Sequence, residues 1–270
     1  DIDEFNPCKN SLGDLVKKEY REIYADILRP YLESINFVIS DDTLGIYGVS
    51  EEFIDLSFKN DPQKTLEVLS KARHAPNVKK LLEGKDVVGI LLSGENFVLN
   101  SNLLRNFSGL ISEDGMRMLI EESFKNDPMA TVEILTDIAQ YLDEKMVVKF
   151  RDYIISNVDS LSGSYVCSKS IAKLLSTHPS ILEYIFEKAP QSAMPLLQSC
   201  RVQDLSDEAK DIVKAKLTNT GYVIGYKDNN PYLFDLMFEE SLKNNFQKTM
   251  EFGTEGFFDR KKFVENALEK

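Results

Sequence analysis

The chain reads SFKNDP at residues 57–62 and again at residues 123–128, a displacement of 66 positions. The match continues past the proline, because TLEVL at residues 65–69 is answered by TVEIL at residues 131–135. A looser third copy, SLKNNFQKTME, spans residues 241–251, and a degenerate fourth, LLSTHP, spans residues 174–179. Self-similarity of this kind predicts a chain built from repeated structural units.

The NDP at the end of this motif indicates one helix that stops and a second helix that starts at once. Asp61 can accept hydrogen bonds from the first amides of the second helix, and Pro62 suits the first helical position because no amide donor is needed there. Apolar residues at helical spacing precede the turn, as at Ile54 and Phe58, and follow it, as at Leu66. The motif therefore predicts a helical hairpin at each copy.

A second signature, an aromatic residue followed by valine, precedes each hairpin. It reads NFVIS at residues 36–40, NFVLN at 96–100, SYVCS at 164–168 and GYVIG at 221–225. Its aromatic residues lie 60, 68 and 57 positions apart: Phe37, Phe97, Tyr165 and Tyr222. Further helical stretches are predicted at residues 19–32, 78–92, 143–158 and 206–217, the last with Ser206 as its N-cap. Together these patterns predict an all-α fold of about four degenerate repeats with roughly three helices each.

The composition predicts one folded domain. The 270 residues are 43% hydrophobic with only 13 Gly and 9 Pro, and no Gly/Ser-rich or Pro-rich linker divides them. We therefore expect a single helical-repeat domain over residues 1–270. It would comprise an N-terminal cap or extension at 1–18, repeats at 19–252 and a C-terminal capping helix at 253–270.

The formal net charge of −12 repels phosphate backbones and attracts basic partners, although an acidic balance also serves solubility. No apolar run is long enough to cross a bilayer, and the acidic start DIDE is not a signal peptide. The three cysteines, Cys8, Cys167 and Cys200, form no CxxC pair. We expect a soluble, cytoplasmic protein that binds neither DNA nor membranes. Delivery into another cell as an effector stays open.

The capped hairpins and the repeat resemble those of the α-solenoid superfamily that includes HEAT and armadillo proteins, over residues 19–252. This resemblance implies a right-handed solenoid with a concave binding surface. The aromatic signature also resembles the inner helix of Pumilio-type RNA-binding repeats, where a small polar residue, an aromatic residue and a third polar residue contact one base. The corresponding residues here are Asn36, Phe37 and Ser40, then Asn96, Phe97 and Asn100, then Ser164, Tyr165 and Ser168.

Two sets of residues are candidates for partner binding. Glu67, Glu133 and Glu251 recur at one place in the hairpin's second helix and would align as an acidic stripe, or as solvated helix faces. Asn36, Asn96 and Ser164 would form a polar ladder that grips an extended ligand, with Phe37, Phe97, Tyr165 and Tyr222 as possible base-stacking rings. The alternative is that the aromatic residues are buried anchors between repeats and that Asn or Ser caps the next helix.

No catalytic motif is present. The sequence lacks HExxH, GxGxxG, a P-loop and GxSxG, and its two histidines, His74 and His178, lie near prolines without acid, base or metal-ligand partners nearby in sequence. We predict no catalytic residues, no metal and no cofactor. The expected function is a scaffold or adaptor that binds a protein or extended peptide of basic character. Binding of single-stranded RNA, which the acidic charge disfavours, and an enzyme with an unrecognised site are the alternatives.

Overall fold

The structure is a computed structural model of the 270-residue chain, and it describes residues 33, 36–40, 51–71, 82–161, 164–223 and 231–254. In these ranges the regular structure is helical and there is no strand, which confirms the all-α class. No helix of the described ranges has the length and apolar character needed to span a membrane. The expected helix at 19–32, the cap at 1–18 and residues 255–270 of the capping helix lie outside the described residues.

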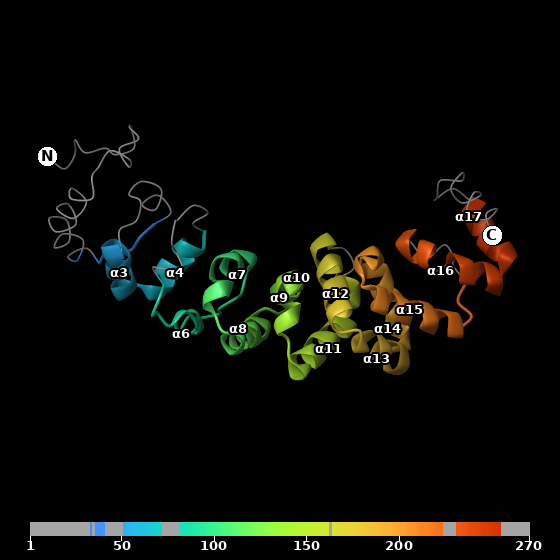
Figure 1. Ribbon diagram of the computed structural model, residues 1–270, viewed down its shortest axis with the longest axis horizontal. Helices are drawn as coiled ribbons and strands as arrows, with labels where there is room; N and C mark the ends of the chain where they lie inside the picture. Colours follow the sequence, from blue (N-terminus) through green and yellow to red (C-terminus); the bar gives the residue numbers. More distant parts are fainter. Residues whose placement is uncertain are drawn as a thin grey trace, which may run out of the picture. The chain divides into compact units, whose positions relative to one another are not determined.

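The chain divides into two compact units, Asp1–Asp127 and Pro128–Lys270. In the first unit α3 packs against α4, α4 packs against both α6 and α7, and α6 packs against α8 (Figure 1). The bounds of these helices are Glu51–Asn60 for α3, Pro62–Lys71 for α4, Val87–Leu92 for α6, Ser101–Phe107 for α7 and Glu113–Asn126 for α8. A short 3-10 turn at Ser108–Leu110 follows α7.

The helical hairpin predicted at the first SFKNDP copy is confirmed. Only Asp61 separates α3 from α4, and its carboxylate accepts a hydrogen bond from the amide of Lys64 at 2.9 Å. Pro62 is the first residue of α4, and the apolar side of this helix, including Leu66 and Leu69, is fully buried. In the third copy, Asn245 alone separates the helices at Pro231–Asn244 and Phe246–Thr254, and its side-chain oxygen accepts a hydrogen bond from the amide of Lys248 at 3.0 Å.

A chain of buried hydroxyl groups holds this hairpin together. The Ser57 hydroxyl accepts a hydrogen bond from the amide of Ile39 at 3.0 Å and lies 2.6 Å from the Thr65 hydroxyl. Thr65 in turn donates to the carbonyl of Asp61 at 2.6 Å, so Ser57 is the donor to Thr65. Both side chains are fully buried, so each hydroxyl depends on its neighbour for a partner.

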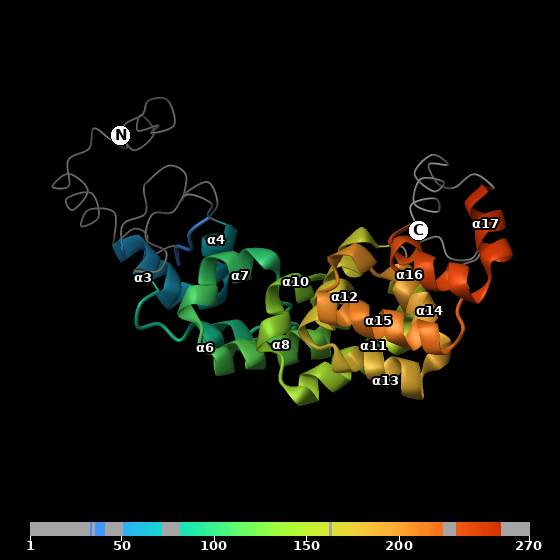
Figure 2. The ribbon, with the colours of Figure 1, turned by 45° about the vertical axis from the view of Figure 1, so that its right-hand side comes forward.

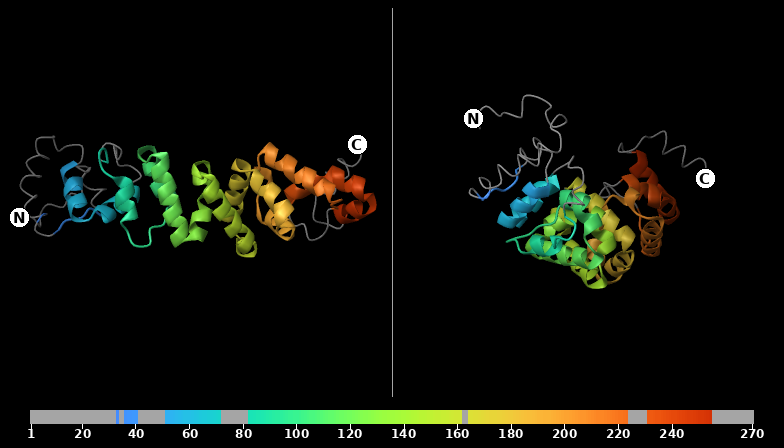
Figure 3. Two further views of the ribbon diagram at one scale, coloured as in Figure 1. Left: turned by 90° about the horizontal axis from the view of Figure 1, so that it is seen from below. Right: turned by 60° about the vertical axis from the view of Figure 1, so that its left-hand side comes forward.

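In the second unit some consecutive helices pack together, namely α9 with α10, α12 with α13, α13 with α14, α15 with α16 and α16 with α17 (Figure 2 and Figure 3). Helices further apart in the sequence also pack together, as α11 does with α14 and α12 with α15. Their bounds are Pro128–Glu133 for α9, Leu135–Ile138 for α10, Glu144–Leu161 for α11, Tyr165–Thr177 for α12, Ser180–Lys188 for α13, Pro190–Ser199 for α14, Asp207–Asn219 for α15, Pro231–Asn244 for α16 and Phe246–Thr254 for α17. Two 3-10 turns lie at Ala139–Tyr141 and Val202–Asp204.

Two of the further predicted helices are confirmed, and a third is described only in part. The stretches at 143–158 and 206–217 correspond to α11 and α15, and Ser206 caps α15 by accepting a hydrogen bond from Ala209. In the stretch expected at 78–92, residues 78–81 lie outside the described residues, and residues 82–85 form a turn in which Gly84 has a φ of 78°. The helix α6 therefore begins at Val87, after Asp86 has capped it.

Candidate functional site

Three of the sequence-predicted site residues, Glu67, Asn96 and Phe97, line one open groove in the first unit. The groove has a volume of about 690 Å³. Its walls are α4 with the preceding Asp61, the loop of residues 94–100 and the first residues of α7, and we call it the α4–α7 groove. The sequence motifs that recur along the chain thus meet at one surface here.

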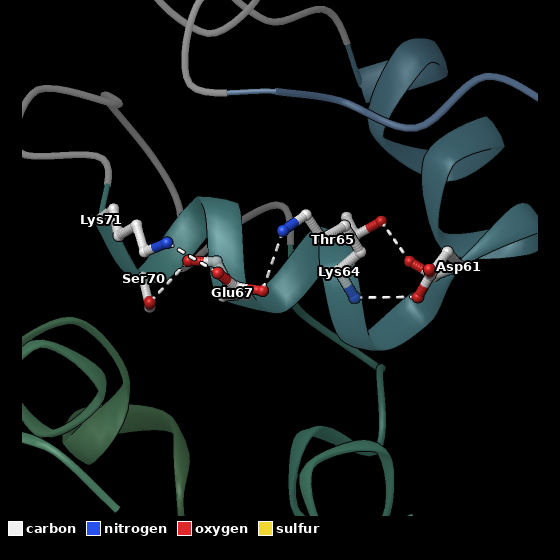
Figure 4. Close-up of polar contacts among 6 residues, drawn as sticks. All are labelled: Asp61, Lys64, Thr65, Glu67, Ser70 and Lys71. Atoms are coloured by element: carbon white, nitrogen blue, oxygen red, sulfur yellow. Dashed lines mark hydrogen bonds and ion pairs between the residues drawn. The ribbon is translucent and has the colours of Figure 1, made fainter. Parts of the chain in front are cut away.

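The α4 wall of the groove carries paired charges (Figure 4). Glu67 lies 3.1 Å from the ammonium of Lys64 and 2.6 Å from that of Lys71, one turn away on either side. The hydrogen bonds from Lys71 and then Lys64 hold the pKa of Glu67 below its usual range, although burial acts in the opposite direction. The charge of this predicted acidic position is therefore compensated on its own helix.

The other two positions of the predicted acidic stripe differ in what the structure shows of them. Glu133 is exposed at the last residue of α9, and its main-chain carbonyl accepts a hydrogen bond from the Ser170 hydroxyl at 2.7 Å. The side chain of Glu251 lies outside the described residues. The alignment of Glu67, Glu133 and Glu251 in one stripe stays a prediction.

The loop wall is fixed to α8 by two hydrogen bonds. The Asn126 side chain donates to the carbonyl of Phe97 at 3.0 Å, and the amide of Leu99 donates to the Ser123 hydroxyl at 2.9 Å. Asn96 enters this segment with a φ of 56°, in the left-handed region where asparagine and glycine are favoured. Asn100 ends the segment and is the N-cap of α7.

The same arrangement recurs at two other copies of the aromatic signature. In each, a residue with positive φ precedes the aromatic residue, and the last residue of the hairpin's first helix donates its side-chain amide to the aromatic carbonyl. The sets are Asn36 (φ 51°), Phe37 and Asn60 at 3.0 Å, and Gly221 (φ 66°), Tyr222 and Asn244 at 3.1 Å. The left-handed backbone accounts for asparagine at Asn36 and Asn96, and their role as ligand contacts stays a prediction.

The prediction that Ser164 and Tyr165 are equivalent to Asn96 and Phe97 is wrong. Ser164 has a φ of −98° and caps α12 by accepting a hydrogen bond from Cys167. It thus takes the role of Asn100, four residues further along the signature. A serine side chain caps a helix from extended backbone, and this is incompatible with the left-handed conformation at Asn96.

The four predicted stacking rings differ in exposure. Phe37, Phe97 and Tyr222 are half-buried, and Phe97 lines the α4–α7 groove. The Tyr165 side chain is 70% exposed, but the Arg201 guanidinium lies 4.8 Å from its ring centroid and donates to its hydroxyl. Arg201 is also held by Asp204 at 2.8 Å. The most exposed ring is therefore already in contact with a cation of its own chain.

The groups with catalytic or metal-binding potential are engaged in the packing. His178 donates from Nε2 to the carbonyl of Ala139 at 3.1 Å, and His74 lies outside the described residues. Cys167 and Cys200 are buried free thiols, and burial raises the pKa of Cys200 to about 12. Within the described ranges no three or more His, Cys, Asp or Glu side chains are grouped to hold a metal ion.

Comparisons of the chain with protein-family models, with curated proteins and with solved structures find no match.

The groove also contains residues that were not predicted from the sequence as site residues. Lys64 and Lys71 lie at i−3 and i+4 from Glu67, a helical spacing that the sequence alone contains. Val98 belongs to the aromatic signature and Glu95 directly precedes it. Only the structure shows that this loop forms a wall of the groove.

Proposed function

We propose that the chain is a peptide-binding protein that holds a segment of a partner protein in the α4–α7 groove, in the manner of a scaffold or adaptor. The observation that carries the proposal is the meeting of Glu67, Asn96 and Phe97 on one open groove of about 690 Å³. An open groove with mixed polar and apolar walls suits an extended segment, whereas a small-molecule site is usually a more enclosed, mostly apolar pocket.

The charges of the groove favour a segment with a basic side chain. Its lining contains three carboxylates, Asp61, Glu67 and Glu95, against two ammonium groups, Lys64 and Lys71. Glu67 is compensated by both lysines, whereas Glu95 is exposed and forms no ion pair within the described part of the chain. A basic residue of the peptide would pair with Glu95 and would be attracted by the chain's net charge of −12.

We also propose a repeat architecture of the HEAT/armadillo type for the chain, which we place in the cytoplasm. Support for the repeat comes from the hydrogen bond between asparagine and the aromatic carbonyl, which occurs at Asn60, Asn126 and Asn244. A repeat protein presents equivalent loops on one side of its stacked units, and such surfaces bind extended partners. The first unit's groove would then be one of several related sites.

The proposal is tested by selection from a phage-displayed library of random dodecapeptides, with a pool of random 12-nucleotide RNA screened in parallel. We expect peptides with at least one Lys or Arg to be selected. Their Kd should rise about tenfold for Glu95→Lys and stay unchanged for Glu183→Lys, an exposed position on α13 outside the groove. Selection of RNA and no peptide, or equal binding by both variants, would overturn the proposal.

A further inference from the structure

We propose that the bound peptide pairs with the main-chain edge of Val98, as an added extended strand along residues 97–100. This inference rests on the proposed function and specifies its chemistry. The ligand is an extended peptide with a free main-chain N–H and C=O at one residue and a basic side chain near it. Main-chain hydrogen bonds would hold the peptide, and side chains would select it.

The orientation of Val98 follows from the two hydrogen bonds on either side of it. The carbonyl of Phe97 and the amide of Leu99 both meet side chains of α8, at 3.0 and 2.9 Å. In an extended chain the carbonyl of one residue and the amide two residues on lie on the same side, and the groups of the residue between them lie on the opposite side. The amide and carbonyl of Val98 therefore point away from α8.

The backbone and the groove are consistent with this geometry. Residues 97–100 contain no helix or turn, and Asn100 is extended, with φ −140° and ψ 164°. Val98 is half-buried and lines the α4–α7 groove. Neither its amide nor its carbonyl forms a hydrogen bond within the part of the chain that the structure describes. One edge of the segment is thus fixed to the protein and the other edge is open at the groove.

An extended peptide matches this edge better than a helix or a nucleic acid does. A helix uses its own main-chain groups internally, and a phosphate backbone offers no N–H donor for the Val98 carbonyl. A peptide strand supplies one donor and one acceptor at the spacing that a single residue presents. The carboxylate of Glu95, three residues before Val98, provides the charge that a Lys or Arg side chain of the peptide would meet.

The first copy of the motif has the same geometry around Val38. The carbonyl of Phe37 accepts from Asn60, and the amide of Ile39 donates to Ser57. Val38 is half-buried and, like Val98, has no main-chain hydrogen bond within the described residues. The open edge is therefore a property of the motif pair and not an accident of one loop.

The test uses a peptide selected from the dodecapeptide library and two variants of the full chain. Val98→Pro removes the amide donor and keeps the preceding residue in the extended conformation that it needs, whereas Val98→Ala keeps the amide and removes the side chain. We expect the Kd to rise at least about tenfold for Val98→Pro and by a smaller factor for Val98→Ala, which removes part of the groove wall but keeps the amide donor. Unchanged affinity in a folded Val98→Pro variant would overturn the edge pairing.

A second measurement decides the matter even if Val98→Pro fails to fold. Each amide of the selected peptide is methylated in turn, and binding to the unchanged chain is measured. One internal methylation should weaken binding about tenfold, and the amide of Val98 should exchange with deuterium more slowly in the complex. If the peptide binds and Glu95→Lys weakens it, but no methylation weakens it and the Val98 amide is not protected, the proposed function stands and the edge pairing fails. If no peptide binds the chain, both fail.

Discussion

The side-chain amide of Asn126 donates a hydrogen bond to the main-chain carbonyl of Phe97 at 3.0 Å, and this contact joins the two sequence motifs of the chain. Asn126 is the last residue of α8, and Phe97 belongs to the signature 29 positions earlier. Asn60 at the end of α3 and Asn244 at the end of α16 make the same contact. The two motifs recur together because they form one hydrogen-bonded unit.

Replacement of Asn60 or Asn126 by alanine should destabilise the fold although alanine favours helix. Each variant leaves an aromatic carbonyl without its donor, and we expect a loss of about 1 kcal/mol in the free energy of unfolding. Asn219 is the matched control, because it is the last residue of α15 and no hydrogen bond of its side chain occurs in the described residues. Asn219→Ala should change the free energy by less than about 0.5 kcal/mol. Urea denaturation measures all three, and equal effects would show that the contact contributes nothing.

The buried hydroxyl chain makes a second prediction. Thr65→Val keeps the shape of the side chain but leaves the Ser57 hydroxyl buried with no acceptor, which should cost about 1–3 kcal/mol. Thr65→Ser keeps the hydroxyl and loses only a methyl group, at about 1 kcal/mol. The free energies of unfolding of the two variants therefore separate the hydrogen bond from the packing. A valine variant more stable than the serine variant would contradict the directed chain from Ile39 to Asp61.

The hairpins could be predicted from the sequence because their signals are local. Asp61 and Pro62 act within one turn of chain, and the cap at Ser206 is equally short-range. The groove could not be predicted, because it requires α4 and the loop before α7 to lie side by side. Their contact depends on tertiary packing, including the bond from Asn106 of α7 to the carbonyl of Ser70.

The wrong prediction that Ser164 and Tyr165 are equivalent to Asn96 and Phe97 has a physical cause that is visible in the sequence. Matching an aromatic residue followed by valine aligned residue types, but the backbone conformation of the preceding residue defines the signature. Asn36, Asn96 and Gly221 all tolerate positive φ, whereas Ser164 does not share that tolerance. The residue at this one position separates the copy at residues 164–168 from the other three.

The residue before the aromatic residue of the signature has a left-handed backbone at Asn36, Asn96 and Gly221, so we expect asparagine and glycine to be interchangeable there. Gly221→Asn and Asn96→Gly should each change the free energy of unfolding by less than about 0.5 kcal/mol, because both residue types adopt positive φ. Gly221→Val should cost about 1–2 kcal/mol, and the cost is conformational since an added Cβ at Gly221 meets no atom within 4 Å. Thermal denaturation distinguishes these outcomes. Valine tolerated as well as asparagine would mean that φ does not select this residue.

The ion pairs of Glu67 predict a small, pH-dependent contribution to stability. The pKa of Glu67 is lowered from its ordinary value of 4.5, so its contribution is present above that value and is lost as the pH falls through the lower, folded-state pKa. The carboxylate is 49% exposed, and solvent screening limits the effect of Glu67→Gln to about 0.3 kcal/mol at pH 7.

The measurement is a pair of urea titrations at pH 7 and at about pH 2, with the wild-type chain and Glu67→Gln compared at each pH. The difference between them should shrink at the lower pH, because protonation removes the charge that the two lysines contact, and should also shrink at pH 7 in high salt. Glu95→Gln is the control, because this carboxylate forms no ion pair among the described residues. A Glu67→Gln effect that persists at pH 2 would show that the side chain acts through packing and not through its charge.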